Sequence, residues 1–173
     1  LNVVIAPDMR KLNLALVDIG AGTSDIALVS GGSIQNYAMV PMAGDEITEY
    51  LCNEFLLDFN VGEMLKRSLR LPAPLKFQDV LGITHEVDSS KIVETISPGV
   101  RTLAKAIADK ILALHRRAPS AVVLIGGGSL TPTLPAQLAE LLGLPEQRVR
   151  VRGREAIPNL FGEISKLNGP ECI

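Results

Sequence analysis

The chain has 173 residues and a net charge of −2, and 47% of its residues are hydrophobic while only 3% are aromatic. This length fits one domain or two small lobes with an aliphatic core. The scattered Lys and Arg residues provide no basic patch for nucleic acid, and no apolar run reaches the ~18 residues that a membrane span needs.

Two apolar segments, 14–17 and 24–29, predict strands, and the Gly-Gly turn after them predicts a hairpin to a third strand at 34–40. The first two strands are joined by Asp18-Ile-Gly-Ala-Gly-Thr-Ser-Asp25. Its glycines allow the backbone to approach a ligand closely, and successive amides in such a turn can bind an anion. Asp18 is placed at the strand end to hold a metal ion or its water. This loop therefore predicts a phosphate and magnesium site.

Two other interpretations of this loop are open, a dinucleotide-binding fingerprint and a purely structural glycine turn. The fingerprint needs a helix directly after the loop, with a small residue where Asp25 stands. A strand and the Gly31-Gly32 turn are predicted there instead. We therefore favour a hairpin loop that binds phosphates.

The middle of the chain alternates helices with a hairpin. Apolar residues at every fourth position predict a helix from Gly44 to Phe59. A short helix is expected over 62–69, and a hairpin over 76–87. In the helix predicted from Gly44 to Phe59, the side chains expected to form a buried stripe are Ile47, Leu51, Phe55 and Phe59.

The C-terminal half predicts a long helix, a strand and a second helix. Ser97-Pro98 is typical of a capped helix start, and the apolar pattern continues to Leu114. Asp88-Ser89-Ser90 is predicted to cap a separate short turn. The apolar run at 121–125 predicts a strand, followed by Gly126-Gly-Gly-Ser129. A helix is expected next, capped by Thr131, with Pro132 in its first turn and Gly143 at its end. An edge strand at 149–151 and a short helix near 160–167 are expected after it.

The loop at 18–25 resembles the second phosphate motif of the actin-like ATPase superfamily, whose usual bacterial form is Asp-[Ile/Leu]-Gly-Gly-Gly-Thr-x-Asp. Ala21 replaces the middle glycine. The resemblance implies ATP and Mg²⁺ as cofactors. Asp18 would hold the metal through water, as the one residue with a catalytic role. The phosphates would lie against Gly20, Ala21, Gly22 and Thr23.

Residues 62–69 resemble the Glu-x-x-Lys-Arg helix that touches the nucleoside in DnaK-type chaperones. The resemblance implies that Glu63 binds the ribose hydroxyls, that Lys66 binds the ribose or adenine, and that Arg67 stacks on the base. These three side chains share one helix face. By itself the pattern is also typical of a solvated helix face with an internal ion pair.

Residues 121–132 resemble the adenosine motif of the same superfamily. The resemblance implies that Gly127, Gly128 and Ser129 line the adenine site. Chaperones carry an Arg after this motif, whereas this chain has Leu130 and Thr131, which favours another branch. Seen alone, the segment also fits an ordinary strand–loop–helix turn.

Residues 40–48 and 97–101 resemble FtsA-type cell-division proteins. The resemblance, over residues 14–152, implies an α/β fold, the ribonuclease H-like second lobe of an actin-like ATPase, with a mixed sheet flanked by helices and a small α+β subdomain inserted. We expect residues 12–44 and 96–152 in the large subdomain, 45–95 in the small one, and 153–173 in a truncated connection. Leu1 in place of an initiator Met suggests a piece of a longer protein.

The implied function is the ATP-binding lobe of a cell-division or cytoskeletal protein whose nucleotide state controls assembly. Alternatives are a pilus- or microcompartment-assembly ATPase, a chaperone-like reactivase, a small-molecule kinase and a non-catalytic binding module. The expected partners are ATP, the first lobe of the same protein and a self-assembly or division partner, without nucleic acid or direct membrane contact. With half a site, the chain alone should hydrolyse ATP negligibly. Two isolated thiols, Cys52 and Cys172, favour a cytoplasmic location, with membrane association left open for a full-length protein.

Overall fold

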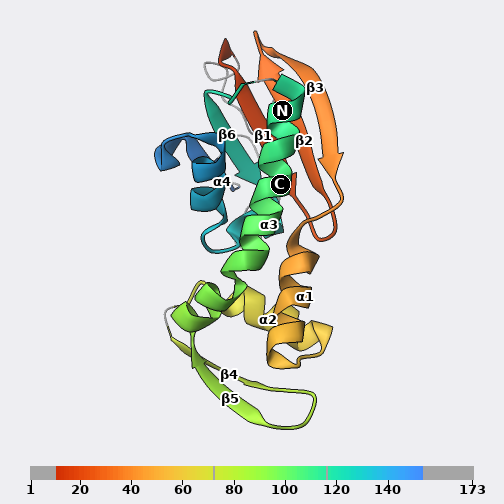
Figure 1. Cartoon of the computed structure of the whole chain (residues 1–173), viewed down its shortest axis with the longest axis vertical. Helices are drawn as coiled ribbons and strands as arrows, with labels where there is room; N and C mark the ends of the chain where they lie inside the picture. The colour runs from red at the N-terminus through yellow and green to blue at the C-terminus, as the bar shows by residue number, and fades with distance from the viewer. Residues whose placement is uncertain (1–10, 72, 116, 154–173) are drawn as a thin grey trace, which may run out of the picture.

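A five-stranded mixed sheet forms the centre of the computed structural model, which describes residues 11–71, 73–115 and 117–153. Its order is β3-β2-β1-β6-β7 (Figure 1). The antiparallel meander consists of β1 (Leu14–Ile19), β2 (Ser24–Ser30) and β3 (Ser33–Val40). β6 (Ala121–Ile125) pairs in parallel with β1, and β7 (Val149–Val151) pairs in parallel with β6. All five predicted strands are thus confirmed.

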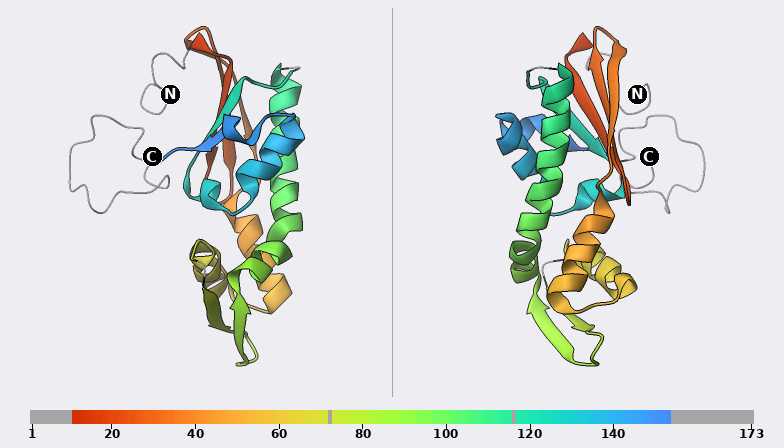
Figure 2. Two further views of the ribbon diagram at one scale, coloured as in Figure 1. Left: turned by 90° about the vertical axis from the view of Figure 1, so that its left-hand side faces the viewer. Right: turned by 45° about the vertical axis from the view of Figure 1, so that its right-hand side comes forward.

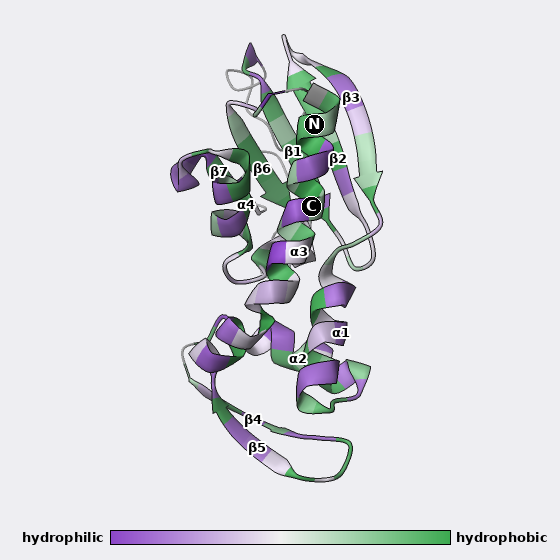
Figure 3. Cartoon of the chain, in the orientation of Figure 1, coloured by the Kyte–Doolittle hydropathy of each residue, from purple (hydrophilic) through white to green (hydrophobic). Residues whose placement is uncertain are grey.

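Two helices, α3 (Ser89–His115) and α4 (Leu134–Leu142), cover one face of this sheet (Figure 2). Alternate β1 side chains point toward them, because strand side chains alternate between faces. Val17 of β1 and Ile107 of α3 belong to the same fully buried cluster. β6 is apolar along its whole length (Figure 3), as expected for a central parallel strand.

A smaller unit lies beyond one end of the sheet (Figure 1). It contains α1 (Gly44–Phe55), α2 (Phe59–Ser68) and an antiparallel hairpin of β4 (Pro74–Gln78) and β5 (Thr84–Asp88). Phe77 of the hairpin packs edge-on against Phe55 of α1, with ring centroids 5.4 Å apart. Together with the main sheet, this unit confirms the predicted α/β class. Among the described residues, no helix is both long and apolar enough to cross a bilayer.

The predicted helix 44–59 is wrong at its C-terminal end. Helix α1 stops because Leu56 adopts a left-handed conformation with φ 52°. Asp58 then caps α2, and its side chain accepts hydrogen bonds from the N–H groups of Asn60 and Val61. Phe59, expected in the buried stripe, consequently belongs to α2 and is 46% exposed.

The expected helix start at Ser97-Pro98 is also wrong, because α3 begins at Ser89 and contains Pro98. Proline removes one backbone donor from a helix interior. The preceding turns nevertheless stay helical, since Ile92 and Ile96 are fully buried against the core. Tertiary packing therefore overrides the local signal.

The start of α4 differs from the prediction as well. Thr131 ends the short 3₁₀ helix η2 (Gly127–Leu130), and α4 begins only at Leu134. The proline in the first turn of α4 is Pro135 rather than Pro132. Gly143 ends the helix in a left-handed conformation, as predicted. The helix expected near 160–167 lies outside the described residues.

Candidate functional site

The three segments singled out in the sequence meet around one pocket of about 350 Å³. They meet because β1 and β6 are parallel neighbours, with Asp18 opposite Ile125, so that the turns that follow both strands leave the sheet at the same end. The pocket is lined by Gly20, Ala21, Gly44, Asp45, Glu63, Lys66, Arg67, Arg70, Gly127, Gly128 and Leu130. Seven of the predicted site residues are in this lining, and α1 and α2 close its other side.

The loop after β1 is tied to the N-terminus of α1. The carbonyl of Gly20 accepts a hydrogen bond from Gly44 N–H at 3.1 Å, and the carbonyl of Ala21 accepts one from Asp45 N–H at 2.8 Å. The Gly20 N–H donates to the Thr23 carbonyl at 3.0 Å and is therefore already used. Within the described chain, the N–H groups of residues 21–23 donate no hydrogen bond. These three amides are the ones left to bind an anion.

Ala21 fits the loop without backbone strain. It is not among the residues with a positive φ, so the glycine that the superfamily pattern has here is not needed for conformational freedom. Gly22 and Thr23 are exposed next to it but lie outside the lining of the pocket. The residues predicted to hold phosphates are thus split between the pocket and its edge.

Asp18 is exposed at the end of β1, close to the turn after β6. Partial desolvation of its carboxyl raises its pKa above the ordinary value, and the neighbouring carboxyl of Asp25 raises it further. Asp25 itself accepts a hydrogen bond from the Tyr37 hydroxyl at 2.6 Å. A single carboxylate of this kind fits Mg²⁺, which is usually bound by one or two carboxylates together with water and substrate phosphates. No group of three or more metal-ligating side chains occurs within residues 11–71, 73–115 and 117–153.

The turn after β6 depends on glycine. Gly126 has φ +81°, and a Cβ there would collide with Asp18 Oδ1 and with the Ile19 carbonyl. A Cβ on Gly128 would collide with the Ile19 side chain. This close approach places η2 directly against the end of β1. Ser129, predicted as a ligand contact, is buried, and its hydroxyl donates to the Gly126 carbonyl at 2.7 Å, so it closes the turn.

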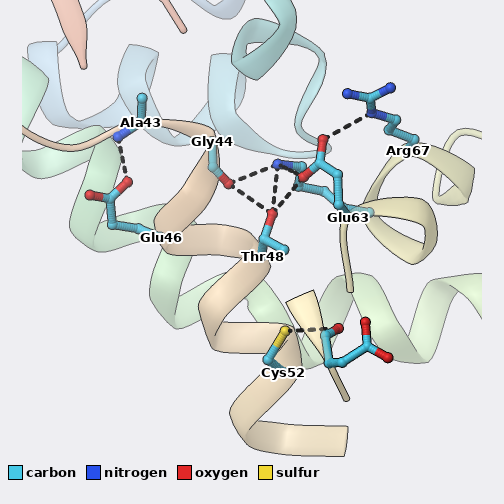
Figure 4. Close-up of polar contacts among 9 residues, drawn as sticks. Ala43, Gly44, Glu46, Thr48, Cys52, Glu63 and Arg67 are labelled. Carbon is cyan, nitrogen blue, oxygen red and sulfur yellow. Dashed lines mark hydrogen bonds and ion pairs between the residues drawn. The ribbon is translucent and has the colours of Figure 1, made fainter. Parts of the chain in front are cut away.

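Helix α2 contributes a connected group of charged side chains to the pocket (Figure 4). One carboxylate oxygen of Glu63 accepts from Lys66 Nζ at 2.6 Å and from the Thr48 hydroxyl at 2.8 Å. Its other oxygen accepts from Arg67 Nε at 2.9 Å. Lys66 also donates to the Gly44 carbonyl and to Thr48 Oγ1, each at 2.8 Å. The three predicted residues are therefore together, with Thr48 as a fourth member.

These contacts keep Glu63 ionised. Burial alone raises the pKa of its carboxyl, but the hydrogen bonds from Lys66, Thr48 and Arg67 outweigh burial and lower the pKa to about 2. At neutral pH the pocket therefore contains a fixed carboxylate. A carboxylate accepts hydrogen bonds, so it can bind hydroxyl groups of a ligand.

The sequence reasoning missed five participants, which are Gly44, Asp45, Thr48, Arg70 and Leu130. Arg70 lies in the turn directly after α2, beyond the reach of helical periodicity, and its only signal was a basic residue close to Arg67 in the sequence. It has no ion-pair or hydrogen-bond partner among the described residues. Thr48 carried no comparable signal, because its role depends on how α1 packs against α2.

The family model described as cell division protein FtsA matches residues 15–172 of this chain. The cell shape-determining protein Mbl of Bacillus subtilis is 30% identical over 157 residues, which cover 75% of this chain and 46% of that protein. FtsA of Pseudomonas aeruginosa is 47% identical over 45 residues, which cover 26% of this chain and 11% of that protein. The chain therefore spans less than half the length of these two curated relatives.

Solved structures share the fold. A chain of the PilM–PilN type IV pilus biogenesis complex superposes with a TM-score of 0.69 at 22% identity, covering 95% of this chain and 44% of that one. A non-polymerising mutant of MamK bound to AMPPNP superposes with a TM-score of 0.65 at 22% identity, covering 84% of this chain and 51% of that one. These likenesses confirm the predicted fold of an actin-like ATPase lobe.

Proposed function

The chain belongs to the FtsA family of cell division proteins, and we propose that it is a nucleotide-binding lobe whose nucleotide state controls the assembly of an FtsA-like protein. The proposal is supported above all by one observation. Segments that resemble a phosphate motif, a nucleoside helix and an adenosine motif all contribute residues to one pocket. The MamK structure that shares the fold is bound to AMPPNP, which is consistent with an adenine nucleotide here.

We propose the following roles for the residues of the pocket. The free amides of residues 21–23 bind phosphate oxygens, and the Asp18 carboxylate holds Mg²⁺ through water. Glu63 accepts hydrogen bonds from the ribose hydroxyls, and Arg67 lies against the base. Exposed Gly127 allows the base to approach the backbone, because it carries no side chain. Gly128 lines the same pocket, and its missing side chain lets the turn pack against Ile19. Bound Mg²⁺ would neutralise charge on the phosphates.

Hydrolysis is expected to need more than these residues. Phosphoryl transfer depends on positioning and on charge stabilisation from several sides. In this lobe the described pocket supplies one wall, formed by the loop, α1, α2 and η2. We therefore expect the isolated chain to bind nucleotide weakly and to turn it over negligibly. In a complete protein, nucleotide held between two lobes would set their relative angle, and this hinge closure would control contacts between subunits.

Titration of the isotope-labelled chain with Mg·ATP, followed by amide NMR, tests the proposal. We expect shifts to cluster at residues 20–23, 63–67 and 126–129, and to weaken in Asp18→Asn. The matched control is Asp109→Asn, which removes an exposed carboxylate on α3, away from the pocket. Absence of shifts at millimolar ATP, both here and in a longer protein containing this lobe, would reject nucleotide binding.

A further inference from the structure

We propose that Lys66 is a positioning residue, which holds the Glu63 carboxylate toward the pocket and does not itself bind the nucleotide. This inference rests on the proposed function of the pocket. It replaces the role suggested by family resemblance, in which Lys66 contacts the ribose or adenine directly.

The three N–H donors of Lys66 already have acceptors. A lysine ammonium group carries three donors and no acceptor. Its Nζ lies 2.8 Å from the Gly44 carbonyl, 2.8 Å from Thr48 Oγ1 and 2.6 Å from Glu63 Oε2. The side chain is only 12% exposed. A bond from Lys66 to a ligand would therefore replace one of these three partly buried contacts.

Glu63 and Arg67, by contrast, have atoms to spare. Glu63 Oε1 accepts one hydrogen bond, from Arg67, although a carboxylate oxygen can accept two. Arg67 donates through Nε alone, and its side chain is 75% exposed. Within α2, these two residues have free capacity at the pocket, whereas the donors of Lys66 are used.

The surroundings of Lys66 are fixed from the other side as well. Gly44 is held by its own N–H, which donates to the Gly20 carbonyl at 3.1 Å. A Cβ on Gly44 would lie 3.2 Å from both Lys66 Nζ and the Gly20 carbonyl, so the ammonium packs closely against the backbone at Gly44. Lys66 thus connects the helix that carries Glu63 to a backbone position next to the phosphate loop.

A double-mutant cycle with two ligands tests this role. If Lys66 acts through Glu63, then Lys66→Met weakens ATP binding about tenfold, and adding it to Glu63→Gln weakens binding no further. Neither change should affect 2′,3′-dideoxy-ATP, which lacks the hydroxyls that Glu63 would bind. Lys110→Met is the matched control, because it removes an exposed lysine charge on α3 and should leave both affinities unchanged.

Additive losses in the double variant, or an equal loss for the dideoxy ligand, would overturn the inference while leaving the proposed function intact. If the wild-type chain and a longer protein that contains it bound neither ligand, the proposed function would fail, and this inference with it. If Lys66→Met does not fold, Lys66→Gln is the second variant, because its amide keeps two donors. It should weaken ATP binding less than Lys66→Met, and adding it to Glu63→Gln should again weaken binding no further. A carboxyl NMR titration supplies a readout without ligand, since in Lys66→Met the pKa of Glu63 should rise from about 2.

Discussion

Gly126 packs so closely against Asp18 that a single methyl group at position 126 would overlap the Asp18 carboxylate. The same methyl group would overlap the Ile19 carbonyl. The Asp18 carboxylate, which is proposed to hold Mg²⁺, can therefore occupy its position only because Gly126, in the turn after β6, has no side chain. This relationship leads to a stability prediction that separates steric overlap from backbone strain.

Gly126→Ala should destabilise the chain by more than about 2 kcal/mol, because it adds a steric clash to the cost of a positive φ. Gly143→Ala is the matched control, since Gly143 also has a positive φ, of 64°, but nothing lies within 4 Å of its Cβ position. It should cost only about 1 kcal/mol. Urea unfolding of both variants measures the difference. If the two variants lost equal unfolding free energy, the turn after β6 would be able to move away from Asp18 and avoid the clash.

Thr48→Val should also destabilise the chain, by about 1–2 kcal/mol, because it removes a hydroxyl that donates to Glu63 and accepts from Lys66. Valine has nearly the shape of threonine, so packing is preserved. Thr102→Val is a suitable control, because Thr102 is exposed and bonds only the carbonyl of Pro98 in its own helix. Denaturant unfolding should show a change below about 0.5 kcal/mol for the control. If Thr48→Val also lost less than about 0.5 kcal/mol, the hydrogen bonds among Thr48, Glu63 and Lys66 would contribute little to stability.

The ion pairs of Glu63 predict a specific pH dependence of stability. The folded-state pKa of about 2 lies below the ordinary pKa of 4.5 for a glutamate, so this carboxylate stabilises the fold above pH 4.5, and the stabilisation disappears as pH falls toward 2. We expect a contribution of about 1–2 kcal/mol, since solvent screens a side chain that is 26% exposed. Unfolding free energies of the wild type and Glu63→Gln should differ at pH 6 and converge near pH 2. A constant difference would show that the stabilisation does not come from ionisation.

Asp18→Asn should remove the effect of Mg²⁺ on nucleotide affinity while leaving metal-free binding nearly unchanged. The amide keeps the size of the side chain but loses the charge that attracts a hydrated cation. Calorimetric titration with ATP, with and without Mg²⁺, gives both affinities. If the variant kept the full metal effect, Mg²⁺ would be held by other groups.

The strands of the sheet could be predicted from the sequence, because short apolar runs bounded by turn residues are strong local patterns. The apolar strands and the glycine turns after Asp18 and Ile125 are such short-range signals. The meeting of the three segments was expected only from their resemblance to motifs of the actin-like ATPase superfamily. Helix boundaries were less predictable. The apolar period of four residues runs through the break at Leu56, and no glycine marks that break. The cap at Asp58 was the available signal.

Two features could not be read from local sequence. Pro98 indicates a helix start, yet burial of Ile92 and Ile96 extends α3 past it. The resemblance implies that Lys66 contacts a ligand, yet its donors are used by Glu63, Thr48 and the Gly44 carbonyl, which the packing of α1 against α2 brings close. In both cases tertiary contacts decide between alternatives that the local pattern leaves equal.

The parallel pairing of β1 with β6 also determines when the pocket can exist during folding. The two strands are far apart in the chain, so their pairing is a long-range contact, which is characteristically slow to form. A ligand that needs both glycine turns cannot recognise the chain before this step is complete. Such a ligand should leave the folding rate almost unchanged and act by slowing unfolding, so that the bound protein gains lifetime rather than speed of assembly.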